Sequence, residues 1–244
     1  MISERRCFFL PVRRVTQFSC FERGRTHDAR GNDDLSLKDV RFPFPCPGLV
    51  SRENLCHVAG KKEPVMYYTM SCPSPLGELT LAGDEEHIVG LWLEGQKYFA
   101  ATLKGKPTCH RETPVLALAH AWLERYFAGE RPSPSELPLA PEGSAFRLKV
   151  WKALCDIPYG EVTTYGNIAA RLSEQDEGKA CSPRAVGGAV GHNPVSIIIP
   201  CHRVVGTGGS LTGYAGGLER KILLLQREGV DVARFRIPAA GSAL

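Results

Sequence analysis

The chain has 244 residues, of which 43% are hydrophobic and 23% are charged, and its formal net charge is +4. This balance is ordinary for a globular protein, and the length is enough for one large domain or two small ones. No apolar run approaches the length of a membrane-spanning helix, which argues against a membrane protein.

The net charge conceals an uneven distribution along the chain. Residues 1–65 and residues 145–244 each carry a net charge of +4, whereas residues 66–144 carry −4. A basic segment beside an acidic one is compatible with nucleic-acid contact through the basic part.

Nine cysteines are scattered along the chain at irregular spacing, without a C-x-x-C pair. The apolar patch near the N-terminus is too short for a signal peptide, so we expect reduced thiols in an intracellular protein. The compartment would be the cytoplasm of a bacterium or the nucleus of a eukaryote. Cys109-His110 alone does not supply the paired ligands of a zinc site, and we expect no metal or other cofactor.

Residues 1–65 show no sustained hydrophobic period, and their mixture of proline, glycine and charge predicts a mobile extension. From residue 66 the pattern becomes that of a small α+β domain, expected over 66–142. Its predicted elements are strands over 66–71, 78–82 and 88–93, and a helix between an N-cap at Thr113 and a stop at Gly129. The helix is expected to pack through an apolar face made of Leu116, Ala119, Ala121, Trp122, Leu123, Tyr126 and Phe127.

A second domain is expected over 143–232, after a proline- and serine-rich linker, with a tail over 233–244. Its predicted helix N-caps are Ser144, Thr164 and Ser182. The first helix is expected to turn one apolar face to the core, made of Phe146, Val150, Trp151, Leu154 and Ile157.

The helices after Thr164 and Ser182 are short and joined by a charged loop, which is typical of a helix-turn-helix. Ordinary helix–helix packing explains the small residues of the second one equally well. The last helix is predicted over 218–228, with Ile222, Leu223 and Leu225 toward the core and Arg220 and Lys221 outward.

The chemistry is indicated by the stretch from Ile197 to His202. Three β-branched residues predict a short buried strand, which Pro200 ends, and Cys201 and His202 follow at once. A rigid strand that leads into a bend suits a nucleophile, and a neighbouring base makes thiolate available. A lone Cys-His pair is nevertheless weak evidence, because buried cysteines usually act as small apolar residues.

The surroundings of this pair resemble one family. Residues 200–204 read Pro-Cys-His-Arg-Val, Asn193-Pro194 precede them, and residues 213–217 read Gly-Tyr-Ala-Gly-Gly. This pattern resembles the O6-alkylguanine-DNA alkyltransferases, also called methylated-DNA–protein-cysteine methyltransferases. The resemblance runs from about Tyr67 to about Val230 and is strongest from Phe146 onward.

The resemblance implies an α+β fold in which a ribonuclease-H-like N-terminal domain supports a mainly α-helical C-terminal domain. The latter would carry a winged helix-turn-helix-like DNA-binding motif, and the protein would be a monomer. The implied function is DNA repair by direct reversal on double-stranded DNA. An alkyl group would pass irreversibly and stoichiometrically from O6 of guanine, and less readily from O4 of thymine, to Cys201.

The resemblance also implies roles for single residues. His202 would take the thiol proton through a water, Glu228 would orient His202, and Tyr165 would donate its hydroxyl to the leaving guanine. Arg184 would fill the place of the flipped base. Close approach to the DNA is expected at Ala185, Gly187 and Gly188, and the pocket is expected to include Asn193, Ser196, Val204, Tyr214 and Ala215. Within it, Asn193 would tie the second helix to the active-site segment by main-chain hydrogen bonds, and the N–H groups of Val204 and Ala215 would read the base.

Three departures from the family pattern stand out. Ser196 lies where relatives have proline, so the alkyl pocket differs, and about five extra residues lengthen the loop around 174–179. Asp84 lies where zinc-binding relatives have a cysteine.

Three other classes of protein fit these residues less well. A lesion-binding relative without the acceptor would lack Cys201. A winged-helix regulator would explain the helix-turn-helix but not a combination of six residues, namely Tyr165, Arg184, Asn193, Cys201, His202 and Glu228. A Cys-His hydrolase would need an oxyanion hole and would turn over repeatedly.

Overall fold

The computed structural model describes residues 65–176 and 180–237. The predicted extension, apart from Val65, and the last part of the predicted tail therefore lie outside the described residues. Within the described ranges, no helix combines the length and the apolar character that crossing a bilayer requires.

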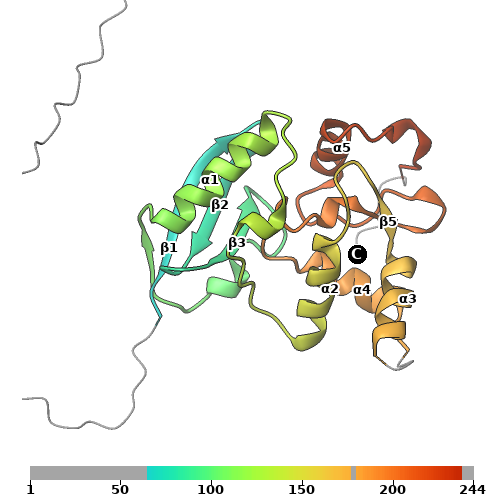
Figure 1. Cartoon of the computed structure of the whole chain (residues 1–244), viewed down its shortest axis with the longest axis horizontal. Coiled ribbons are helices and arrows are strands. Elements are labelled where there is room, and N and C mark those ends of the chain that lie inside the picture. Colours follow the sequence, from blue (N-terminus) through green and yellow to red (C-terminus); the bar gives the residue numbers. More distant parts are fainter. Residues whose placement is uncertain (1–64, 177–179, 238–244) are drawn as a thin grey trace, which may run out of the picture. The chain divides into compact units, whose positions relative to one another are not determined.

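The first half of the described chain is built on a four-stranded sheet (Figure 1). Its strands are β1 (Tyr67–Ser74), β2 (Gly77–Gly83), β3 (Ile88–Leu93) and β4 (Thr108–His110), in the order β3-β2-β1-β4. The pairs β1–β2 and β2–β3 are antiparallel, and β4 runs parallel to β1. The predicted strands are confirmed, but β4 was not predicted.

Strand β1 extends to Ser74, further than its pattern predicts, although it includes Pro73. A proline is tolerated there because β4 pairs with β1 only at Tyr67–Thr69, which leaves the far end of β1 as a sheet edge.

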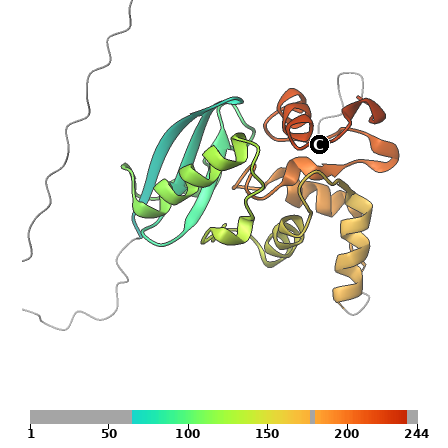
Figure 2. The same cartoon turned by 45° about the horizontal axis from the view of Figure 1, so that its top comes forward.

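Helix α1 (Pro114–Phe127) packs across the sheet, as Figure 2 shows. The Thr113 hydroxyl accepts a hydrogen bond from the Leu116 N–H, and Gly129 has a positive φ just past the helix, so both predicted ends are confirmed. The buried face of α1 consists of Val115, Leu116, Ala119, Trp122, Leu123 and Tyr126.

The second half is mainly helical, which confirms the α+β class and the division into two unlike halves. Its elements are α2 (Ala145–Cys155), β5 (Thr163–Thr164), α3 (Tyr165–Gln175), α4 (Pro183–Gly191), β6 (Val204–Val205) and α5 (Leu218–Arg227). The side chains of Ser144, Thr164 and Ser182 cap α2, α3 and α4 as predicted. Helices α2, α3 and α4 pack on one another, and α5 lies apart from them (Figure 1).

Three predicted side-chain placements are wrong. Phe146 and Leu223 are exposed rather than in the core, because each lies on the outer face of its helix. Lys221 is fully buried rather than outward, since it shares the inner face of α5 with Leu224 and Leu225. Arg220, also expected outward, is only partly exposed and donates to the carbonyls of Leu76 and Glu94 in the first half.

The two halves are joined along the outer edge of β3. The N–H of Leu91 donates to the carbonyl of Pro194 at 2.8 Å, and the N–H of Ser196 donates to the carbonyl of Leu91 at 2.8 Å. The sheet of the first half thereby continues into the segment that leads to Cys201.

Candidate active site

The segment before Cys201 is a tight buried turn, and the predicted strand over Ile197–Ile199 is wrong. Within this described segment, Val195 makes an isolated bridge to Leu91 of β3, and the three isoleucines make none. The chain then bends, because the N–H groups of Ile198 and Ile199 donate back to Ser196 and Val195. Ile197 has a φ of 69°, an unusual value for a β-branched residue, and costs of this kind are typically about 1–3 kcal/mol. Burial of the three isoleucines is as predicted.

Asn193 fixes this turn from within. Its side-chain amide donates to the carbonyl of Ile199 at 2.8 Å and to the Cys201 sulfur at 3.1 Å, and its oxygen accepts from the Val195 N–H. The expected tie between the second helix and the active-site segment is therefore present, and it is made by this one buried side chain.

Cys201 begins a short 3-10 helix, Cys201–Arg203, and only 3% of its surface is exposed. Burial raises the pKa of its thiol, while the Asn193 amide and the positive charge of Lys221 act in the opposite direction. Since the thiol is the resting form, attack by sulfur requires a proton acceptor nearby.

His202 is completely buried and lies against Glu228. Its Nε2 is 2.7 Å from Glu228 Oε1, and Nδ1 has no hydrogen-bond partner among the described residues. Burial lowers the pKa of the imidazole, and Glu228 opposes this effect. A neutral imidazole with one ring nitrogen fixed by a carboxylate can accept a proton at the other.

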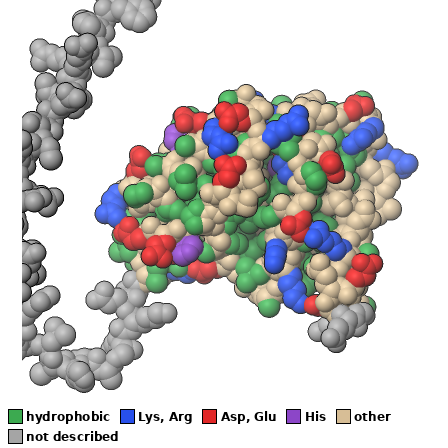
Figure 3. Space-filling view, viewed as in Figure 1, with side chains coloured by type: hydrophobic (Ala, Val, Ile, Leu, Met, Phe, Trp, Pro, Cys, Tyr) green, Lys and Arg blue, Asp and Glu red, His purple; other side chains and the backbone are tan. Residues whose placement is uncertain are grey.

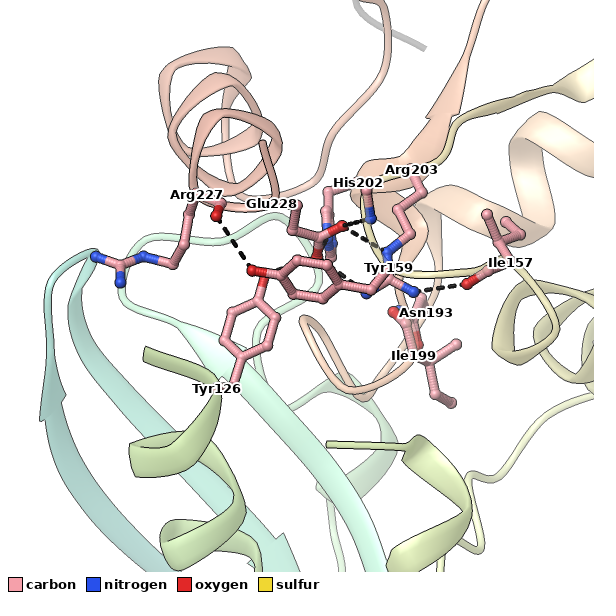
Figure 4. Close-up of polar contacts among 10 residues, drawn as sticks. Tyr126, Ile157, Tyr159, Asn193, Ile199, His202, Arg203, Arg227 and Glu228 are labelled. Atoms are coloured by element: carbon pink, nitrogen blue, oxygen red, sulfur yellow. Dashed lines mark hydrogen bonds and ion pairs between the residues drawn. The ribbon is translucent and has the colours of Figure 1, made fainter. Parts of the chain in front are cut away.

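Glu228 caps the C-terminus of α5 and receives several donors (Figure 4). Besides His202, Arg203 donates to it through Nε at 2.8 Å and through Nη2 at 3.0 Å, and the Gly160 N–H donates at 3.2 Å. Although burial raises the pKa of this carboxyl, the bonds from His202 and Arg203 lower it to about 2. Glu228 is therefore a fixed negative charge.

Gly160 allows the chain to come this close to Glu228. Its φ is +77°, and a Cβ atom placed there would lie 2.9 Å from the Glu228 carbonyl oxygen.

Lys221 is an active-site residue that sequence reasoning missed. Its ammonium group donates to the carbonyl of Val204 at 2.5 Å and to that of Thr212 at 2.8 Å. Burial lowers its pKa to about 8, against the influence of the Cys201 thiol. The sequence signal for its burial is helical spacing. Lys221 lies three and four residues before the buried Leu224 and Leu225, and seven before Glu228, so these residues share one face of α5.

Tyr165 is the first residue of α3 and is almost completely buried. Its hydroxyl is 3.3 Å from the carbonyls of Thr212 and Gly213, to which it donates. Burial raises its pKa, so the phenol stays a hydrogen-bond donor. The Thr212 carbonyl thus connects Tyr165 with Lys221.

The expected pocket residues come from several segments, and two of them contact the first half. Ser196 donates to Gln96 Oε1 at 2.9 Å, and the Ala215 carbonyl accepts from the Lys97 N–H at 2.9 Å. The Tyr214 hydroxyl is buried and lies near the Ser196 side chain, and burial raises its pKa. The Val204 N–H, expected to read the base, instead donates to the Cys201 carbonyl.

The expected DNA-contacting residues are on α4. Arg184, Ala185 and Gly188 are exposed, and no neighbouring atom lies within 4 Å of a Cβ built on Gly188. Gly187, in contrast, is buried and faces the core, so its expected place on the exposed face is wrong.

The distribution of charge on the surface is mixed. On the face shown in Figure 3, Lys and Arg side chains alternate with Asp and Glu. Arg171 and Lys149, for example, pair with Asp156 and Asp176. The charge excess in the sequence therefore does not produce a single basic surface on this side of the molecule.

Among residues 65–176 and 180–237, no group of three or more His, Cys, Asp or Glu side chains could hold a metal ion. Cys109 and His110 lie in β4 at the surface, and His110 faces Thr69.

Comparison with known proteins identifies these two halves. The model of the 6-O-methylguanine DNA methyltransferase ribonuclease-like domain matches residues 66–141, and that of the DNA binding domain of the same family matches residues 145–230. The chain belongs to this family. Its activity is accordingly that of a methylated-DNA–protein-cysteine methyltransferase, which repairs DNA by direct transfer of an alkyl group to a cysteine.

Individual relatives agree with this assignment. The chain is 46% identical to the methylated-DNA–protein-cysteine methyltransferase of Haemophilus influenzae over 165 residues, which are 67% of this chain and 86% of that protein. It is 44% identical to the constitutive enzyme of Bacillus subtilis over 166 residues, which are 68% and 96%.

Solved structures of the family share the fold. The Mycobacterium tuberculosis O6-methylguanine methyltransferase matches with a TM-score of 0.54 and 40% identity, over 71% of this chain and 96% of that one. The M. tuberculosis OGT crystallised in complex with DNA matches with a TM-score of 0.55 and 39% identity, over 70% and 95%. These comparisons therefore support DNA as the binding partner of this chain.

Proposed function

We propose that this member of the family repairs O6-alkylguanine in double-stranded DNA with Cys201 as the single-use acceptor. The observation that carries the assignment is the Asn193–Cys201 hydrogen bond beside the buried His202–Glu228 pair. Of the five free cysteines in the described part of the chain, Cys201 alone is hydrogen-bonded by an amide and adjoins a buried histidine held by a carboxylate.

The first step is removal of the thiol proton. His202 Nδ1 accepts it through a bridging water, while Glu228 holds Nε2 and remains ionised. Lys221, nearby and cationic, favours the thiolate by its charge. The S–H bond breaks and an N–H bond forms, which leaves a thiolate and an imidazolium.

The second step is in-line displacement at the alkyl carbon. A sulfur–carbon bond forms, the carbon–O6 bond breaks, and the electron pair remains on guanine. Tyr165 donates its hydroxyl to the leaving base, which requires it to exchange its bond to the Thr212 or Gly213 carbonyl for one to the ring. The guanine anion takes up one proton as the imidazolium of His202 loses one, so the proton count balances. The thioether on Cys201 is stable, and the reaction ends there.

The base reaches Cys201 only after leaving the duplex, which costs a few kcal/mol of stacking and pairing. Arg184, which is exposed in the first turn of α4, would occupy the place that the base leaves in the stack, and its exposure supports this role. Ala185 and Gly188 are exposed on the same helix and have small side chains or none, so they would allow the DNA backbone to come close. One monomer is sufficient for this mechanism, because every assigned residue belongs to one chain.

The experiment compares Cys201→Ala with Cys155→Ala on a duplex that contains O6-methylguanine. We expect Cys201→Ala to lose all transfer but to retain binding to the damaged duplex, whereas Cys155→Ala keeps full stoichiometry. Transfer by the Cys201→Ala variant would contradict the assignment.

A further inference from the structure

The carboxylate of Glu228 receives a donor from the ribonuclease-like half of the molecule. The Tyr126 hydroxyl donates to Glu228 Oε1 at 2.8 Å, the same oxygen that lies 2.7 Å from His202 Nε2. Figure 4 shows Tyr126 reaching Glu228 from the side opposite to His202 and Arg203. No role for this tyrosine was expected from the sequence beyond packing in the core.

The ring of Tyr126 is held on several sides. It stacks on Trp122 with ring centroids 5.6 Å apart and an interplanar angle of 6°, and it meets the edge of Tyr159 at 6.1 Å. Trp122 is fixed in turn, because its indole N–H donates to the Ser133 carbonyl at 2.9 Å. With 1% of its surface exposed, Tyr126 keeps its hydroxyl in one place.

The hydroxyl is a permanent donor. Burial, followed by the negative charge of Glu228, raises the pKa of Tyr126, so it stays protonated. A hydrogen bond to a carboxylate stabilises the charged form and is stronger than one between neutral groups.

We propose that Tyr126 is a positioning residue of the proton relay, through which the ribonuclease-like half fixes the orientation and the charge of Glu228. The proposal rests on the assignment of Cys201, His202 and Glu228 above. Its chemical consequence concerns the proton that leaves Cys201. With Tyr126 bound to Oε1, Glu228 stays ionised and the proton rests on His202 until the thiolate has reacted.

Loss of the phenol hydroxyl should change the reaction in two ways. Glu228 loses one of its fixed contacts, so His202 is held less precisely and the transfer slows. The carboxylate also becomes more basic and stabilises the imidazolium more strongly. His202 then keeps its proton to a higher pH, and the midpoint of the acid side of the rate profile moves upward.

The test measures single-turnover transfer from an O6-methylguanine duplex by Tyr126→Phe, from about pH 5 to about pH 9, where a histidine titrates. We expect a rate about tenfold lower at neutral pH, the scale of one hydrogen bond to a charged group, and a midpoint at higher pH. Tyr159→Phe is the matched control. It removes a hydroxyl from the same aromatic cluster, one that donates to the Arg227 carbonyl at 3.1 Å and not to Glu228.

Thermal melting of both variants checks that each remains folded at the assay temperature, and the control should leave the midpoint of the rate profile unshifted. A second arm repeats Tyr126→Phe in a Glu228→Gln background, where the proposal predicts little additional loss. An unchanged midpoint in Tyr126→Phe, or a full additional loss in the Glu228→Gln background, would overturn the proposal. If Glu228→Gln alone matches the wild type in rate and pH profile, the relay assignment itself fails, and the inference with it.

Discussion

The two halves of this protein bury different kinds of side chain. The ribonuclease-like half has an almost wholly apolar interior, in which Gln96 and Thr113 are the buried polar residues among those described. The half that carries Cys201 buries His202, Arg203, Lys221 and Glu228, which all lie between residues 202 and 228. The first half is thus stabilised by packing, whereas the second holds charges whose environment decides its chemistry.

This difference indicates that the apolar half supports the buried charges of the other half. Buried charges are costly, and they are tolerated only where partners satisfy them. The apolar half supplies such support directly, through the Leu91 contacts with the active-site segment and through the Tyr126 hydroxyl. The pH dependence of stability should therefore originate in the second half.

The largest effect is expected for Glu228→Ala. The change leaves the guanidinium of Arg203 buried without its carboxylate, which typically costs about 3–5 kcal/mol of folding free energy. The pKa of Glu228 is lowered to about 2, so its contribution is present above the unfolded value of about 4.3 and is lost as the pH falls toward 2. Urea unfolding at several pH values should show a shallower acid loss in the variant than in the wild type.

Leu116→Ala is the matched control from the apolar half. Leu116 is fully buried, so the variant should lose about 2–5 kcal/mol of stability, yet retain the acid dependence of the wild type. Equal acid dependence in the wild type and Glu228→Ala would show that the buried charges do not control stability.

A smaller effect is expected for Lys221→Met. The carbonyls of Val204 and Thr212 lose their donor, which costs about 1–3 kcal/mol. The folded pKa of about 8 lies below the unfolded value of about 10.4, so the unfolded chain binds more protons in between. Wild-type stability should therefore rise between about pH 8 and pH 10, and chemical unfolding of the variant should show no such rise.

The smallest effect on stability is expected for Arg184→Ala, which removes an exposed side chain. We expect unchanged melting and transfer from free O6-benzylguanine, with slower repair of duplex DNA and a salt slope reduced by about 1. Arg111→Ala makes the same change of charge on the ribonuclease-like half and should leave duplex repair unchanged. Equal losses with the free base and the duplex would assign Arg184 to folding instead of base flipping.

Local signals in the sequence predicted much of this fold. Thr113, Ser144, Thr164 and Ser182 marked helix starts, because a side-chain oxygen next to a helical pattern satisfies free N–H groups. The strand at Ile88–Leu93 and the importance of the Cys-His pair could likewise be predicted from local sequence. These features depend on neighbours in the chain.

Features that depend on distant partners could not be predicted. Three β-branched residues indicated a strand at Ile197–Ile199, but the bonds of Asn193 and the β3 edge impose a turn there. Lys221 was assigned outward from its charge, whereas two carbonyls on other segments receive its ammonium group. Tyr126 was assigned to the core, and only the folded structure places its hydroxyl on Glu228.

The central claim is that Cys201 is the acceptor and is used once. The most direct measurement is peptide mapping by mass spectrometry after incubation with an excess of O6-methylguanine duplex. The account predicts one methyl group per chain, on the peptide that contains Cys201, and no further loss of lesion once every chain is modified. Methylation of another thiol, such as the exposed Cys109, or continued repair by unmodified protein, would contradict it.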